Sequence, residues 1–126
     1  MNKRTQKRKI LIVEDDSSIR EVLGALLHAE GYEAVSAGNG QEALDLLAQQ
    51  SLCPDLILLD LMMPVMDGWE FLRRKACLPT INAMPVVALS AAYGIYSIEH
   101  ASMFLPKPIE LEKLLSAIER LCAPAK

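Results

Sequence analysis

The stretch Leu56–Phe71, LILLDLMMPVMDGWEF, places Asp60 directly after a run of large apolar residues. Four consecutive apolar residues without polar alternation are typical of a strand buried on both faces of a parallel sheet. An ionised carboxylate in such surroundings is costly unless it is paired, bound to a metal or placed at an edge. The stretch therefore predicts a buried strand that holds Asp60 at its exposed carboxyl end.

Strand-like and helix-like patterns alternate along the rest of the chain. Short apolar runs predict strands at 9–14, 32–37, 55–60, 84–90 and 103–106. Apolar residues at helical spacing predict helices at 17–31, 39–50, 67–76 and 110–122. Strands that are apolar throughout and separated by helices indicate an α/β fold, a doubly wound parallel sheet with helices on both faces. We expect the flavodoxin-like strand order 2-1-3-4-5.

Polar residues mark the beginning of three of these helices. Three pairs have the spacing of a capping box: Ser18 with Glu21, Asn39 with Glu42, and Asp67 with Glu70. Gly31 is expected to end the first helix. The basic run 73–75 is interpreted as a solvated end of the third helix, where positive charge interacts favourably with the helix dipole.

Length and charge restrict the class of protein. The 126 residues fit one domain, with residues 1–8 as a flexible basic arm, 9–123 as the folded domain and no output domain. From Ile10 onward 16 acidic residues face 8 basic ones, which argues against nucleic-acid binding by this domain. Three widely spaced cysteines and the lack of a long apolar run predict a cytoplasmic protein without membrane insertion.

Four of the predicted strands deliver chemically active side chains to their carboxyl ends. The set consists of Glu14, Asp15 and Asp16 after the first strand, Asp60 after the third, Ser90 after the fourth and Lys107 after the fifth. Clustered carboxylates attract a cation, and oxygen ligands without His or Cys favour Mg²⁺. A lysine and a hydroxyl beside Asp60 would neutralise charge on an incoming phosphoryl group, so Asp60 is predicted to be a nucleophile that forms an aspartyl phosphate.

Four segments of the sequence resemble a known family. They are KILIVEDD (9–16), DLILLDLMMPVMDG (55–68), PVVALSA (85–91) and FLPKPIE (104–110). In this order and spacing they resemble the response-regulator receiver domains of two-component signalling, over nearly the whole chain. The resemblance implies a signalling domain, not a turnover enzyme. Such a domain accepts a phosphoryl group on Asp60 from a histidine kinase or a histidine phosphotransfer protein, in a Mg²⁺-dependent reaction. Phosphorylation then switches the surface that the domain offers to an unidentified downstream protein or to a second copy of itself.

The resemblance also implies which residues surround the metal ion. Asp15 and Asp60 would bind Mg²⁺ directly, together with the backbone carbonyl of Met62. Glu14 would hold a water molecule bound to the metal, and Asp16 would be peripheral to the site.

Further roles implied by the resemblance concern the phosphoryl group. Ser90 and Lys107 would contact its oxygen atoms, and the Lys107–Pro108 peptide bond would be cis. Phe104 corresponds to the family's switch aromatic, which turns in behind Ser90 after phosphorylation. Because phenylalanine has no hydroxyl group, only the packing part of that coupling would operate.

Two regions depart from the family pattern. In the family, the segment that corresponds to Ser90–Lys107 contains a further helix, the family's fourth. Here this segment is shorter than usual by roughly one helical turn and contains Gly94, so we expect that helix to be short, displaced or irregular. This change concerns the surface with which the family commonly contacts its partners. Met62 and Ala92, which would flank the acceptor, are apolar and cannot orient a hydrolytic water. We therefore expect the domain to lose its phosphoryl group slowly.

Two alternatives remain at this point. A receiver-like adaptor that is not phosphorylated is favoured by the altered fourth-helix segment. A Mg²⁺-dependent phosphohydrolase with an aspartate nucleophile is the second, but such enzymes usually place another acid where this chain has Met62.

Overall fold

The computed structural model describes residues 7–49, 52–91 and 98–122, and five parallel strands in this part of the chain form one sheet. The strands are β1 (Lys9–Val13), β2 (Glu33–Ala37), β3 (Leu56–Asp60), β4 (Val86–Ser90) and β5 (Met103–Pro106). Their order in the sheet is β2-β1-β3-β4-β5, which confirms the predicted doubly wound topology. The apolar run of the opening stretch thus forms the central strand of the sheet.

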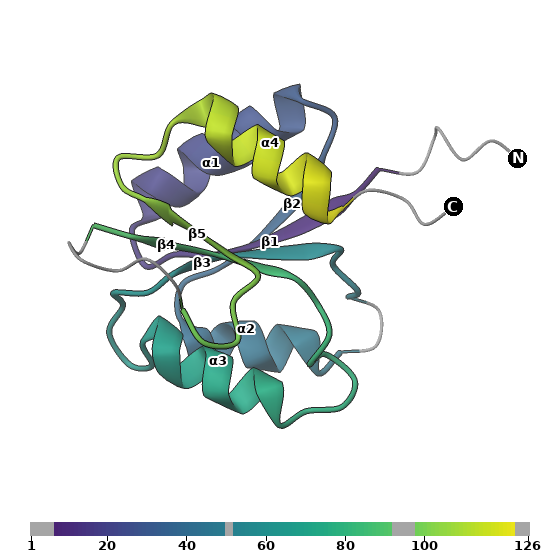
Figure 1. Cartoon of the computed structure of the whole chain (residues 1–126), viewed down its shortest axis with the longest axis vertical. Helices are drawn as coiled ribbons and strands as arrows, with labels where there is room; N and C mark the ends of the chain where they lie inside the picture. Colours follow the sequence, from purple (N-terminus) through teal and green to yellow (C-terminus); the bar gives the residue numbers. More distant parts are fainter. Residues whose placement is uncertain (1–6, 50–51, 92–97, 123–126) are drawn as a thin grey trace, which may run out of the picture.

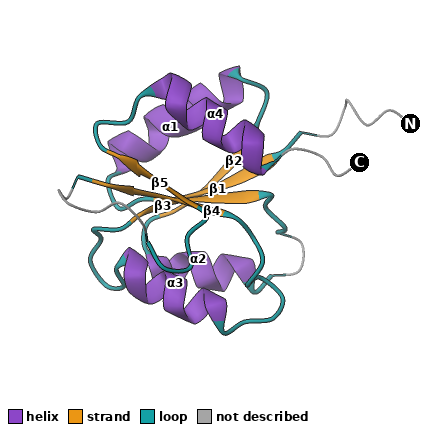
Figure 2. Ribbon diagram, viewed as in Figure 1, coloured by secondary structure: helices purple, strands orange, loops and turns teal. Residues whose placement is uncertain are grey.

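Helices cover both faces of the sheet (Figures 1 and 2). They are α1 (Ser17–Ala29), α2 (Gly40–Leu47), α3 (Gly68–Ala76) and α4 (Leu111–Leu121). Figure 1 shows α1 and α4 side by side on one face, with α2 and α3 on the other. Within the described ranges, no helix is long and apolar enough to cross a membrane.

Each central strand contributes to two hydrophobic cores, because neighbouring side chains of a strand point to opposite faces. Ile10 and Ile12 of β1 pack on the face covered by α1 and α4, whereas Leu11 and Val13 pack beneath α2 and α3. All four are at most 1% exposed. This two-sided burial explains why β1 reads as continuously apolar.

The helix caps agree with the sequence at two of three positions. Asn39 caps α2 by accepting from the backbone N–H of Glu42 at 2.8 Å, and Asp67 caps α3 through Glu70 N–H at 2.9 Å. The prediction for α1 was wrong. Asp16 is its cap and accepts from two backbone N–H groups, those of Ser18 and Ile19. The helix therefore begins before Ser18, which lies inside its first turn.

The end of α3 differs from the predicted solvated basic run. Arg73 and Arg74 are exposed and both pair with Glu70, but Lys75 is buried to 3% exposure. Lys75 follows the buried Phe71 by one helical turn, and its ammonium donates to the backbone carbonyl of Asn82 at 3.1 Å. Lys75 therefore lies on the interior side of the helix, and its burial lowers the pKa of its ammonium.

The segment between β4 and β5 is described only in part. The short helix predicted between β4 and β5 falls largely on residues 92–97, which lie outside the described residues. Residues 1–6 of the basic arm lie outside them as well. Residues 98–102, which are described, form turns, and the backbone of Ser102 pairs with Val86 at the start of β4. β5 is an edge strand, where Pro106 removes no N–H from a central ladder.

Candidate functional site

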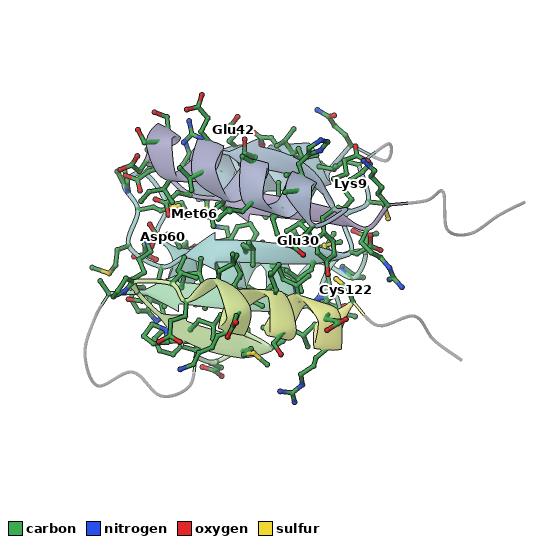
Figure 3. The ribbon with its side chains drawn as sticks, turned by 90° about the horizontal axis from the view of Figure 1, so that it is seen from above. Lys9, Glu30, Glu42, Asp60, Met66 and Cys122 are labelled. Carbon is green, nitrogen blue, oxygen red and sulfur yellow. The ribbon has the colours of Figure 1, made fainter. Side chains whose placement is uncertain are left out.

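Three acidic side chains converge at one end of the sheet. Asp60 is the last residue of β3, while Glu14 and Asp15 follow the neighbouring parallel strand β1. Carboxylate oxygens of these three residues lie within 4.8 Å of one another. Figure 3 shows Asp60 at the end of the sheet opposite to Lys9, with which β1 begins. The topology therefore brings Asp60 together with two adjacent acids that are far from it in the sequence.

A lysine from the loop after β5 lies against two of these acids. The ammonium nitrogen of Lys107 is 3.3 Å from Glu14 Oε1 and 3.4 Å from Asp60 Oδ1. Its backbone N–H donates to the carbonyl of Ser90, at the end of β4, over 2.9 Å. The Lys107–Pro108 peptide bond is cis, as predicted. The carboxyl ends of β1, β3 and β5 thus bring two carboxylates and one ammonium group together.

Burial and charge act together on the ionisable groups of this cluster. Burial raises the pKa of the Glu14 carboxyl, and the nearby Asp60 raises it further, while a hydrogen bond from the Asp16 N–H and the Lys107 charge oppose the rise. Burial alone would lower the pKa of Lys107, but the carboxylates of Asp60 and Glu14 outweigh burial and raise it. Lys107 is therefore held in its charged form beside the two acids.

The other two acids of the EDD run have different environments. Asp15 is exposed and belongs to the convergent group. Asp16 uses its side chain as the cap of α1, and its backbone N–H donates to Glu14 Oε2 at 3.2 Å. Asp16 therefore lies outside the convergent group, although it directly follows two of the group's acids in the sequence.

The loop after Asp60 is held close to the Asp60 carboxylate. The backbone N–H of Met62 donates to Asp60 Oδ1 at 3.2 Å, while the Met62 side chain is 58% exposed. The N–H of Gly68 donates to the carbonyl of Leu61 at 2.9 Å, which closes the loop onto β3. A Cβ atom at Gly68 would lie 2.7 Å from the Leu61 Cα, so glycine permits this close approach.

The two predicted switch residues lie on adjacent strands. Ser90 is fully buried at the end of β4, and Phe104 in β5 pairs with Ala88 in the sheet register. Phe104 is partly buried and packs against the core beneath α2 and α3. Ala92, the predicted second flanking position, lies outside the described residues.

One residue beside the site was missed by the sequence reasoning. Arg20, in the first turn of α1, donates from Nη1 to the backbone carbonyl of Glu14 at 2.7 Å. Its spacing of six residues from Glu14, across a strand–helix junction, was the available signal, because a long side chain in the first helical turn can reach back to the preceding strand.

The donor set suits a hard divalent cation. Glu14, Asp15 and Asp60 offer only carboxylate oxygens to a bound ion. Oxygen ligands of this kind favour Mg²⁺ over softer metals. Three carboxylates with one lysine also leave an excess of negative charge, which a divalent cation would balance.

The chain is a doubly wound α/β protein with an acidic cluster and a lysine at the carboxyl ends of its strands, where proteins of this class bind their ligands. The family model described as "Response regulator receiver domain" matches residues 10–119. The chain therefore belongs to the response-regulator receiver domains, the CheY-like domains of two-component signalling. Members of this family are phosphoacceptor signalling modules, not true enzymes, and the acidic pocket is consistent with such a phosphorylation site.

Similar proteins support this assignment in sequence and in structure. "Response regulator MprA" of Mycolicibacterium vanbaalenii is 37% identical over 118 residues, which cover 90% of this chain and 49% of that protein. The chain thus spans about half the length of the curated relatives it matches.

Solved structures of receiver proteins have the same fold. The signal receiver domain of a histidine kinase from Syntrophus aciditrophicus is 33% identical, with a TM-score of 0.82 and coverage of 94% of this chain and 92% of that chain. The response regulator TrrA of Thermotoga maritima, solved in complex with Mg²⁺-BeF, is 30% identical, with a TM-score of 0.80 and coverage of 90% and 98%.

Proposed function

We propose that this protein is a phosphorylation-dependent signalling receiver in which Asp60 accepts a phosphoryl group from a histidine kinase or a histidine phosphotransfer protein. The observation that carries the proposal is the convergence of Glu14, Asp15 and Asp60 around a lysine that contacts two of them. The proposal includes a cytoplasmic location, where a partner would present its phosphohistidine.

Asp15, Asp60 and the backbone carbonyl of Met62 would hold Mg²⁺, with Glu14 acting through a bound water. The metal ion would supply positive charge beside the phosphoryl oxygens, which phosphoryl transfer requires. Support comes from the all-oxygen donor set and from the Mg²⁺-BeF complex of TrrA. Lys107 and Ser90 would bind the remaining phosphoryl oxygens, because both lie at the same end of the sheet as Asp60.

The transfer step forms one bond and breaks one. A carboxylate oxygen of Asp60 attacks the phosphorus of the donor, and the bond from phosphorus to the imidazole nitrogen breaks. The leaving imidazole retains the electron pair and takes up a proton, while Asp60 becomes an aspartyl phosphate. Lys107, already beside Asp60, offsets the charge that accumulates on the transferred group.

The proposal is tested by the intact mass of the protein after incubation with acetyl phosphate, with Mg²⁺ and with EDTA. Wild type should gain one phosphoryl group only with Mg²⁺, and Asp60→Asn should gain none. Asp45→Asn is the matched control, because Asp45 is exposed on α2 and pairs only with Gln41 among the described residues. A phosphoryl group retained by Asp60→Asn would contradict the assignment of the acceptor.

The same experiment separates the proposal from the unphosphorylated adaptor. An adaptor would gain no phosphoryl group, and its partner binding would be unchanged in Asp60→Asn. In the proposed receiver, phosphorylation alters the surface recognised by a downstream protein, with Ser90 and Phe104 as the switch residues. Pull-down of a candidate partner with and without BeF₃⁻ therefore distinguishes the two.

A further inference from the structure

We infer that Arg20 is a positioning residue that fixes the main chain of Glu14 and thereby aims the acidic cluster at its cation. This inference rests on the proposed function, because it concerns the metal affinity of the same site. Arg20 itself contributes no atom to the convergent acidic group. Its contact is with the backbone carbonyl of Glu14, at 2.7 Å from Nη1.

The main chain at Glu14 needs such a contact because it lies beyond the end of β1. The strand ends at Val13, and α1 begins at Ser17, so the acid-bearing residues lie in the connection between them. The N–H of Glu14 still donates to the carbonyl of Ala37 at 3.1 Å, but its own carbonyl has passed the last residue of the ladder. Arg20 donates to that carbonyl, which fixes the peptide that joins Glu14 to Asp15.

The guanidinium of Arg20 lies next to the loop after β2. Arg20 lies against Gly38, where an added Cβ atom would be 3.4 Å from Arg20 Nη1 and 3.3 Å from Glu42 Oε1. The Glu42 carboxylate accepts from the Gly38 N–H at 2.6 Å, and the Glu42 N–H donates to the Asn39 side chain. The first turn of α2 and Gly38 therefore hold the Glu42 carboxylate at the place where Arg20 passes on its way to Glu14.

Charge and positioning predict opposite effects on metal affinity. As a cation bound to the main chain of Glu14, Arg20 should weaken the binding of Mg²⁺, so removing its charge alone would strengthen binding. As a positioning residue, Arg20 should strengthen binding, because groups that orient ligands contribute substantially to metal affinity. The sign of the change in affinity therefore decides between the two roles.

The test is the Mg²⁺ dissociation constant by titration calorimetry, with the electron paramagnetic resonance spectrum of bound Mn²⁺ as a second readout. Arg20→Met should weaken Mg²⁺ binding by roughly tenfold, the low end of the range for residues that orient ligands. Arg20→Lys, which keeps a donor and a charge, should recover part of the affinity. Arg120→Met removes the same charge from an exposed position on α4 and should leave the affinity unchanged.

Unchanged or tighter binding in folded Arg20→Met would overturn the inference, and so would equal affinities of the Lys and Met variants. If Arg20→Met does not fold, Gly38→Val adds side-chain atoms beside the guanidinium while Arg20 is retained, and unchanged or tighter Mg²⁺ binding in this variant would equally overturn the inference. Wild type that binds no Mg²⁺ would overturn the proposed function and this inference together. Wild type that binds Mg²⁺ as tightly as Arg20→Met would overturn the inference alone.

Discussion

The ammonium nitrogen of Lys107 lies 3.4 Å from the carboxylate of Asp60, although 47 positions separate the two residues in the sequence. The same ammonium is 3.3 Å from Glu14, so one cation neutralises part of the charge of two acids. In the proposed reaction Lys107 turns from these acids to the phosphoryl oxygens. In the proposed receiver, the lysine and a metal ion would therefore share the same carboxylates before phosphorylation.

Replacing Lys107 should therefore separate metal binding from phosphorylation. Lys107→Met removes a positive charge beside the cluster, and we expect Mg²⁺ to bind at least roughly fivefold more tightly, since two unit charges about 4 Å apart already repel by about 1 kcal/mol in water. The yield of phosphorylated protein should nevertheless fall, because the phosphoryl oxygens lose a partner. Lys107→Arg, which retains the charge, is the control for affinity. Weaker Mg²⁺ binding in Lys107→Met would show that the lysine supports the metal site.

The lifetime of the phosphorylated state should be long. The Met62 side chain is exposed next to Asp60 and cannot orient a water molecule for attack on the acyl phosphate. We expect wild type to lose its phosphoryl group over minutes or longer, and Met62→Glu to lose it several-fold faster. The measurement is the decay of the phosphorylated mass after the donor is removed. Decay of wild type within seconds would contradict this expectation.

Replacement of glycine by alanine should have opposite effects on stability at positions 68 and 24. Gly68→Ala would place a Cβ atom 2.7 Å from the Leu61 Cα and 3.0 Å from the Asp60 carbonyl, so we expect a loss of about 2–3 kcal/mol in the free energy of unfolding. Gly24→Ala meets only the Ala34 side chain at 4.0 Å, inside α1, and should stabilise the protein by about 1 kcal/mol. Urea unfolding followed by the fluorescence of Trp69 measures both. Equal effects would show that the loop after β3 can move away from Gly68.

The buried Lys75 should make stability depend on pH in the alkaline range. Burial lowers the pKa of its ammonium in the folded state, so between that value and the ordinary value of 10.5 the unfolded state binds more protons. The unfavourable contribution of the buried Lys75 charge to stability therefore becomes smaller as the pH rises through this window. The difference in stability between wild type and Lys75→Met should shrink over the same range.

At neutral pH, Lys75→Met should raise the free energy of unfolding by about 1 kcal/mol, since a charge leaves the interior and the exposed Asn82 can bond to water. Lys113→Met, at an exposed position of α4, should change little. A difference between wild type and Lys75→Met that is independent of pH would rule out titration of Lys75 as the cause.

Much of this architecture could be predicted from the sequence. Continuously apolar runs such as that of β3 are buried on both faces, and parallel strands bring Glu14, Asp15 and Asp60 to one edge. What the sequence did not predict was the role of Asp16, which the resemblance places at the periphery of the site. Asp16 caps a helix although it is continuous with two site acids, and the difference depends on where the helix begins.

Lys75 and Arg20 show the same limit of sequence reasoning. Lys75 ends a run of three basic residues, and only its position one turn after Phe71 indicates that it lies on the buried side of α3. Arg20 resembles any surface arginine until the three-dimensional structure places its guanidinium on the Glu14 carbonyl. Spacing along the chain shows that such contacts are within reach, but no pattern of residue types shows that they form, so they become visible only in the folded chain.

The most direct test of the central claim is to identify the modified residue itself. Protein phosphorylated with acetyl phosphate and Mg²⁺ is reduced with borohydride, which converts an aspartyl phosphate to homoserine, and is then digested and sequenced by mass spectrometry. Our account predicts homoserine at position 60 and unmodified aspartate at positions 15 and 16. Homoserine at another acidic position, with residue 60 unchanged, would contradict it.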